Sequence, residues 1–143
     1  MRLQRLREAH VAAIDLQPAQ AALRATLTEE VVGNLVRGRG IAIIDRRQVL
    51  ACAGLAPHWP GRSTGWALLS AGIGPNRFIA VHRLIAAALD RHEMRHPGRI
   101  EIQIDPDHAA ALRWATIIGF DIEGRLRRYL PDGRDMILMA RIS

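Results

Sequence analysis

The 143-residue sequence contains no lysine, a single cysteine and few aromatic residues. With one cysteine, Cys52, an internal disulfide and a cysteine-based zinc site are both excluded. No apolar run approaches the roughly 20 residues of a membrane-spanning helix, and the basic N-terminus lacks the apolar stretch of a secretory signal. We therefore expect one domain over residues 1–143, a cytoplasmic location and no membrane partner.

Because lysine is absent, arginine carries all of the strongly basic charge, and the formal net charge is +6. Arginine pairs with phosphates through two parallel hydrogen bonds, so nucleic acids and anionic cofactors are both ligands to consider. The arginines are scattered, however, and no nucleic-acid-binding motif surrounds them. We interpret them mainly as solvated charges and do not expect a nucleic-acid partner.

The apolar periodicity predicts helices first and then a mixture of strands and helices. Interrupted helical spacing covers the first 37 residues, with Pro18 as a break and Thr28 as the cap of the last helix. Apolar runs and alternation predict strands at 40–45, 48–56, 63–72, 99–105, 120–130 and 134–142. Further helices are expected at 74–96 and 108–119. This order indicates an α+β (mixed α/β) fold with mostly antiparallel strands.

The last third of the sequence resembles the C-terminal half of the GNAT superfamily of acyltransferases. That family typically shows Asn-x-x-Ala-x-x-Leu-Tyr-x-x-x-Gly-Phe, followed by a strand with Glu-Gly. The matching residues here are Ala111, Gly119, Phe120, Glu123 and Gly124. The resemblance implies a GNAT-like fold, in which helices flank a central, twisted, mostly antiparallel sheet. It also implies an acyl-CoA-dependent N-acyltransferase, in which an amine attacks the thioester of acetyl-CoA directly.

The sequence departs from the family pattern at several functional positions. His108 stands at the family's asparagine, and Ala115 at the tyrosine that protonates the departing thiolate in many members. In the pyrophosphate loop only Arg77 matches, and Ala80 and His82 stand where the family has small residues and would crowd the phosphates. Gly72 and Gly74 just upstream could form a loop of a different shape. These departures support a second interpretation, a GNAT-fold binding or structural module without catalysis. The helix "LRWATIIG" is similar to acetyltransferase-like proteins of tailed bacteriophages, so a virion component is one form of that interpretation.

The resemblance implies that acetyl-CoA lies along the strand at 63–72, with its phosphates at the start of the next helix. A helix N-terminus favours an anion, although a turn and helix start alone also explain Gly-Pro-Asn. The residues assigned to the cofactor are Leu69, Ser70, Ala71, Gly72, Gly74, Asn76, Arg77, His108 and Arg113. The other partner is an unidentified amine acceptor, and self-association or assembly into a virion stays open.

No catalytic residue is assigned from the sequence. An N-acyltransferase of this kind needs a base for the amine and an acid for the thiolate. Glu101, Gln103 and Asp105 alternate along one face of a strand, and Tyr129 and His58 are further titratable candidates. We interpret each of the five as an ordinary solvated residue.

The string from His92 to His96, H-E-x-x-H, is the signature of zinc proteases. Pro97 ends the helix directly after the second histidine, and no third ligand is evident in the sequence. We expect no metal site and interpret these histidines as cover for the end of the core. We also expect Trp114 and Cys52 to be buried, and Trp66 to lie beside the cofactor cleft.

Overall fold

A computed structural model describes residues 1–143 and contains seven strands and five helices. The strands are β1 (Arg2–Arg5), β2 (Arg39–Asp45), β3 (Gln48–Trp59), β4 (Arg62–Leu69), β5 (Arg99–Ile104), β6 (Asp121–Leu126) and β7 (Met136–Ile142). The helices are α1 (Glu8–Ala13), the 3₁₀ helix η1 (Pro18–Thr26), α2 (Glu29–Arg37), α3 (Pro75–Arg95) and α4 (Ala109–Ile117). No helix combines the length and apolar character needed to cross a membrane.

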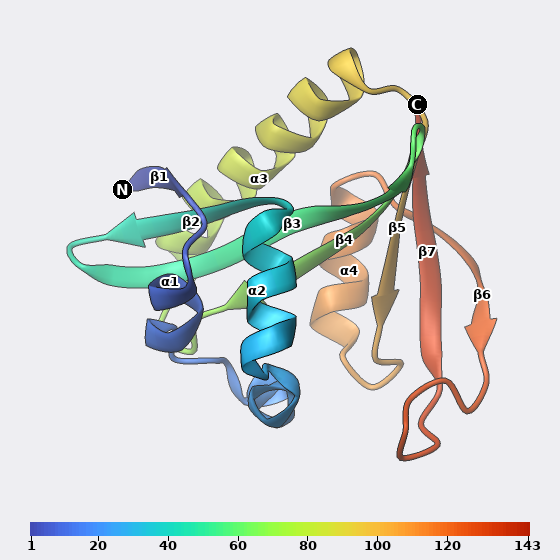
Figure 1. The fold of residues 1–143 in the computed structure, drawn as a ribbon, viewed down its shortest axis with the longest axis horizontal. Coiled ribbons are helices and arrows are strands. Elements are labelled where there is room, and N and C mark those ends of the chain that lie inside the picture. The colour runs from blue at the N-terminus through green and yellow to red at the C-terminus, as the bar shows by residue number, and fades with distance from the viewer.

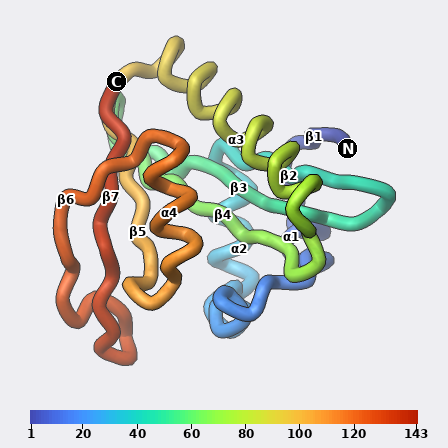
Figure 2. Tube along the Cα trace, turned by 180° about the vertical axis from the view of Figure 1, so that it is seen from behind, coloured from blue at the N-terminus to red at the C-terminus, as the bar shows by residue number.

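The strands form one sheet in the order β1-β2-β3-β4-β5-β7-β6, and only the β4–β5 pair is parallel. Helices α1 and α2 cover one face, and α3 and α4 cover the other (Figures 1 and 2). Ile100 packs on the second face with Ala115, Phe120 and Met139, as the apolar alternation of β5 predicts. The predicted α+β fold with a mostly antiparallel sheet is therefore confirmed.

The N-terminal third differs from the sequence prediction. Residues 2–5 form strand β1 on the edge of β2, where we expected helix. Four residues are too few to show an alternation, and this strand is defined by its pairing and by Leu6, which packs into the core behind it. The segment after Pro18 winds as a 3₁₀ helix that buries no residue. The cap is confirmed, because the Thr28 hydroxyl accepts from the Val31 amide at 3.3 Å.

The β4–β5 pair determines the shape of the molecule's centre. Only three register pairs join the two strands, the last between Thr64 and Glu101. Beyond this point the strands diverge (Figure 1). Their paired end is tight, because the Arg99 amide donates to the Gly61 carbonyl at 2.7 Å. A Cβ atom on Gly98 would lie 2.3 Å from that same carbonyl oxygen, so only glycine fits there.

We expect Gly98→Ala to lower the free energy of unfolding by about 2–4 kcal/mol, through this clash and through strain at φ 145°. Gly124→Ala is the matched control, because its added Cβ meets nothing within 4 Å. Urea unfolding of the two variants and the unmodified chain provides the measurement. Equal stability of both variants would show that the Gly61–Gly98 contact does not hold the paired end.

Candidate functional site

A cavity of about 750 Å³ opens where β4 and β5 diverge. Its volume lies within the range of about 300–1,000 Å³ that is usual for small-molecule sites. Its walls include residues of β4, β5, η1, α3 and α4. Central lining residues are Gln20, Gly65, Trp66, Ala67, Leu69, Ile102, Ile104, Ala111 and Trp114. The cavity is therefore a direct product of the strand divergence.

The charged residues around this cavity are almost all basic. They comprise one acid, Asp105, and the arginines Arg5, Arg39, Arg91, Arg95 and Arg134. Arg134 is neutralised by Asp105 at 3.1 Å and by Asp132 at 2.7 Å. The other four arginines form no ion pair in the structure. This excess of positive charge favours an anionic ligand.

The loop between β4 and α3 adjoins the Leu69 end of the cavity. Gly74 caps α3 with φ 67°, and a Cβ at this position would meet nothing within 4 Å. Because Pro75 follows, the first free amides of the helix belong to Asn76 and Arg77. Open space beside unpaired helix amides fits a phosphate group.

The Arg77 side chain is turned toward the β2–β3 hairpin. Its guanidinium donates to the Gln48 side-chain carbonyl at 2.9 Å and lies 4.0 Å from an Asp45 carboxylate oxygen. Gln48 also donates to the Ser70 hydroxyl at 3.3 Å. The loop is therefore connected to the hairpin through Gln48, and Arg77 is free to contact a phosphate only when it leaves these partners.

The chain itself occupies the main-chain groups of β4 that face away from β3. The Gln20 carboxamide donates to the Ala67 carbonyl and accepts from the Leu69 amide, each at 2.8 Å. The Gln17 amide donates to the Leu69 carbonyl at 2.9 Å. Gln20 was not predicted, since no periodicity or motif links it to a residue 47 positions away on β4.

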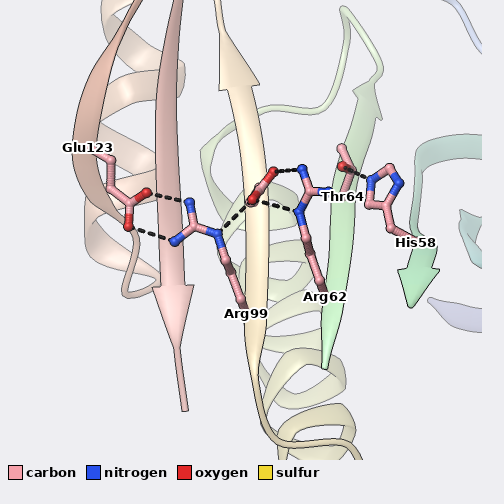
Figure 3. Close-up of polar contacts among 6 residues, drawn as sticks. His58, Arg62, Thr64, Arg99 and Glu123 are labelled. Atoms are coloured by element: carbon pink, nitrogen blue, oxygen red, sulfur yellow. Dashed lines mark hydrogen bonds and ion pairs between the residues drawn. The ribbon is translucent and has the colours of Figure 1, made fainter. Parts of the chain in front are cut away.

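Glu101, one of the candidate bases, is held in an ion-pair network at the paired end of β4 and β5. Arg62 donates to both of its carboxylate oxygens, at 2.9 and 3.0 Å, and Arg99 donates at 2.6 Å. Arg99 also pairs with Glu123 (Figure 3). Hydrogen bonds from Arg62 and then Arg99 lower the pKa of Glu101 to about 2. A carboxylate held in this way is a poor proton acceptor, and it lies outside the cavity lining.

The structure separates the other catalytic candidates into two groups. Gln103 and Asp105 line the cavity, although Asp105 is paired with Arg134. His58 lies outside the lining and its ring contacts the Thr64 hydroxyl at 2.7 Å (Figure 3). Tyr129 is 52% exposed and also lies outside the lining. Gln103 on β5 and Asp105 directly after it are therefore the candidates that reach the cavity.

Solved structures with the same arrangement of elements are acetyltransferases, by their descriptions. Ard1 from Thermoplasma volcanium has a TM-score of 0.81 and 16% identity over 99% of this chain and 96% of its own. Ribosomal-protein-alanine N-acetyltransferase from Brucella melitensis has a TM-score of 0.76 and 18% identity over 100% of both chains. A GNAT family acetyltransferase from Elizabethkingia anophelis with acetyl-CoA bound has a TM-score of 0.66 and 17% identity, covering 88% of this chain and 90% of its own.

The chain has the GNAT fold. No protein-family model matches the sequence, and no curated protein matches it either. At these identities the shared property is the fold. None of the three similar structures is described as a phage protein, so the similarity to phage proteins stays a prediction.

The nine residues assigned to the cofactor lie in three places in the structure. Leu69 and His108 line the cavity. The residues from Ser70 to Arg77 belong to the loop and the first turn of α3, just beyond the lining. Arg113 is exposed on α4 and also lies outside the lining. Their part in cofactor binding stays a prediction.

The H-E-x-x-H string lies at the end of α3 in this GNAT fold. The rings of His92 and His96 are 5.1 Å apart, and both residues line the cavity instead of covering the core as we expected. Glu93, the glutamate of this string, accepts from Arg141 at 2.8 Å. No group of three or more His, Cys, Asp or Glu side chains is arranged to hold a metal ion. Burial, together with the neighbouring His96 and Arg39, lowers the pKa of His92.

Trp66 and Cys52 agree with the sequence interpretation, whereas Trp114, which we expected to be buried, is half-buried and lines the cavity. Trp114 packs edge-on against Phe78, and its indole N–H donates to His82 at 3.1 Å. Trp66 lines the cavity from β4. Cys52 is fully buried, and burial raises the pKa of its thiol to about 12, which leaves it unreactive.

We expect the ion-pair network to make stability depend on acid. Because its pKa is lowered in the folded chain, Glu101 contributes stability above about pH 4.5 that is lost as the pH falls toward 2, on the order of 2 kcal/mol. Glu101→Gln should remove this contribution and flatten the curve of unfolding free energy against pH, while Glu29→Gln, at an exposed site on α2, should not. Urea unfolding between pH 2 and 7 tests this, and parallel curves for Glu101→Gln and the unmodified chain would contradict it.

Proposed function

We propose that the protein is an acyl-CoA-dependent N-acyltransferase that transfers an acetyl group to an amine. The observation that carries this proposal is the divergence of β4 and β5 after three register pairs, which opens a basic cavity beside the N-terminus of α3. The similar structure from Elizabethkingia anophelis is described with acetyl-CoA bound. A thioester whose phosphates lie at the start of α3 and whose extended arm lies between β4 and β5 matches the position of this cavity.

The residues present fit acetyl-CoA in two of three respects. The loop at Gly74 offers open space and free helix amides for phosphates, and the cavity offers apolar walls for an extended arm. The third respect concerns the main-chain groups of Ala67 and Leu69 that face away from β3. A ligand can use these groups only when Gln20 releases them. Acetyl-CoA supplies the thioester that an amine attacks, with formation of an amide and a free thiol.

His108 is the residue that we propose as proton acceptor for the amine. Its half-buried side chain lines the cavity and makes no hydrogen bond to another residue. Histidine is the side chain that most often acts as a general base in enzymes. Ala115 occupies the position of the family's tyrosine, so no general acid stands there. A thiol with a pKa near that of cysteine, about 8.5, can leave as the thiolate without one.

The alternative is a GNAT-fold binding or structural module that performs no chemistry, with a phage virion component as one form. Three features support it: the alanine at position 115, the lack of glycine in the first turn of α3, and the closure of β4 by Gln20. Binding of acetyl-CoA separates the two proposals. Only the transferase proposal requires an amine acceptor.

We expect calorimetric titration with acetyl-CoA to show binding in the micromolar range. Ala111→Trp should weaken it at least tenfold, because the indole would fill part of the cavity that Ala111 lines. Ala109→Trp is the matched control on the same helix, since Ala109 is exposed and outside the lining. No heat at millimolar acetyl-CoA would overturn the transferase proposal and favour the non-catalytic module.

We expect His108→Ala to lower kcat by about 100-fold at neutral pH. The side chain of His108 does not cap α4, so its removal should leave the helix intact. His58→Ala, outside the cavity, is the control. Thiol release measured with a panel of primary amines gives the rates, and the lysine-free chain adds no side-chain amine of its own. An unchanged kcat would assign the proton to another acceptor.

A further inference from the structure

Strand β4 has an outer edge that no other strand covers beyond Thr64. Ala67 and Leu69 pair with Ala53 and Ala51 of β3 on one side, while β5 has already diverged on the other. The groups turned toward the gap are the Ala67 carbonyl and the Leu69 amide and carbonyl. We call these three groups the open edge. Unpaired groups of this kind on a strand bind extended chains that carry amides.

Gln20 binds the open edge with a single carboxamide. The Gln20 nitrogen donates to the Ala67 carbonyl and its oxygen accepts from the Leu69 amide, both at 2.8 Å. A secondary amide of a ligand would offer the same donor and acceptor to the same two groups. The Gln17 side chain donates to the Gln20 oxygen at 3.2 Å and so helps to orient it. Gln20 therefore occupies a position that an amide-bearing ligand can take.

Residues 15–20, which we call the strap, hold Gln20 in place. The Gln17 amide donates to the Leu69 carbonyl at 2.9 Å, and the Asp15 carbonyl accepts from the Ala71 amide at 2.8 Å. Leu16 and Ser70 form an isolated bridge between these bonds. The 3₁₀ helix that continues the strap buries no residue. Hydrogen bonds therefore provide much of the attachment, and their exchange for a ligand's amides costs little free energy.

We propose that Gln20 acts as a latch on the open edge, along which the GNAT resemblance already places the cofactor, and that acyl-CoA must displace the Gln20 carboxamide to bind there. This inference rests on the proposed function, which supplies the ligand. The pantetheine arm carries two amide groups in an extended chain, so it can replace both hydrogen bonds of Gln20. Ala67 and Leu69 line the cavity at its end next to the loop at Gly74, where we propose that the phosphates bind.

The latch has a quantitative consequence. If the ligand binds only the unlatched chain, the measured affinity is the intrinsic affinity reduced by the fraction of chains that are unlatched. A substitution that weakens the latch therefore raises the affinity, whereas a residue that merely supports the site would lower it. The direction of the change distinguishes the two roles.

The test measures acetyl-CoA affinity by calorimetry for the full chain and three variants. Gln20→Ala removes both hydrogen bonds, and Gln20→Glu keeps the size but places an acceptor opposite the Ala67 carbonyl. Both should bind acetyl-CoA about five- to tenfold more tightly than the unmodified chain. Gln4→Ala is the matched control, because the Gln4 side chain contacts only Arg7 at the surface, and its affinity should not change.

Hydrogen exchange at the Leu69 amide provides a second readout. We expect this amide to exchange faster in Gln20→Ala than in the unmodified chain, and acetyl-CoA to restore its protection. Thermal unfolding checks that both variants at position 20 remain folded.

Three outcomes count against the proposal. Binding by the unmodified chain with equal or weaker binding by both Gln20 variants overturns the latch and leaves the proposed function standing. Binding without protection of the Leu69 amide shows that the ligand does not use the open edge, and also overturns the latch. If none of the four proteins binds acetyl-CoA, the proposed function fails and the latch fails with it.

Discussion

The hydrogen bond from the Arg99 amide to the Gly61 carbonyl holds together the paired end of β4 and β5, the two neighbouring strands that run parallel. Gly98 brings the two chains within a distance that no side chain would permit. The ion pairs of Glu101 with Arg62 and Arg99 cross the same strands one residue further along. Backbone contacts and ion pairs both fix this end, so β4 and β5 diverge from a defined point beyond it. The cavity, its arginines and the open edge of β4 all depend on that starting point.

The two ends of the β4–β5 pair have opposite chemistry. At the closed end Glu101 is buried between the guanidinium groups of Arg62 and Arg99. At the open end a glutamine side chain substitutes for a neighbouring strand. Charge-assisted hydrogen bonds hold a structure in one geometry, whereas a neutral carboxamide can be exchanged for another amide. This contrast is the reason that we propose binding at the open end and rigidity at the closed end.

The parts of the fold that were predictable from sequence have local causes. The isoleucines of β5 alternate, Pro97 ends α3, and Thr28 caps α2, so each signal lies within a few residues of its effect. The Gly119-Phe120 pair additionally carried the resemblance to the GNAT family. Strand β1 escaped prediction because its four residues become a strand only when they meet β2.

The candidate site was less predictable for the same physical reason. The alternation of β5 placed Glu101, Gln103 and Asp105 on one face, but it contained no information on the arginines that pair with the two acids. The contact of Gln20 with Ala67 and Leu69 joins segments far apart in the chain and depends on the chain path after Pro18. The histidines of the H-E-x-x-H string were expected to cover the core, but they line the cavity, because their helical spacing carries no information on the strands that diverge beside them.

The positions of the tryptophans give the cavity an optical property. Trp66 lies on its β4 wall and Trp114 on its α4 wall, whereas Trp59 is 59% exposed at the β3–β4 hairpin, outside the lining. Indole emission responds to the polarity and contacts of its immediate surroundings. Two of the three fluorophores therefore report what enters the space between the diverging strands, and the third supplies a steady solvent-exposed background. The chain carries its own spectroscopic probe of occupancy, without any added label.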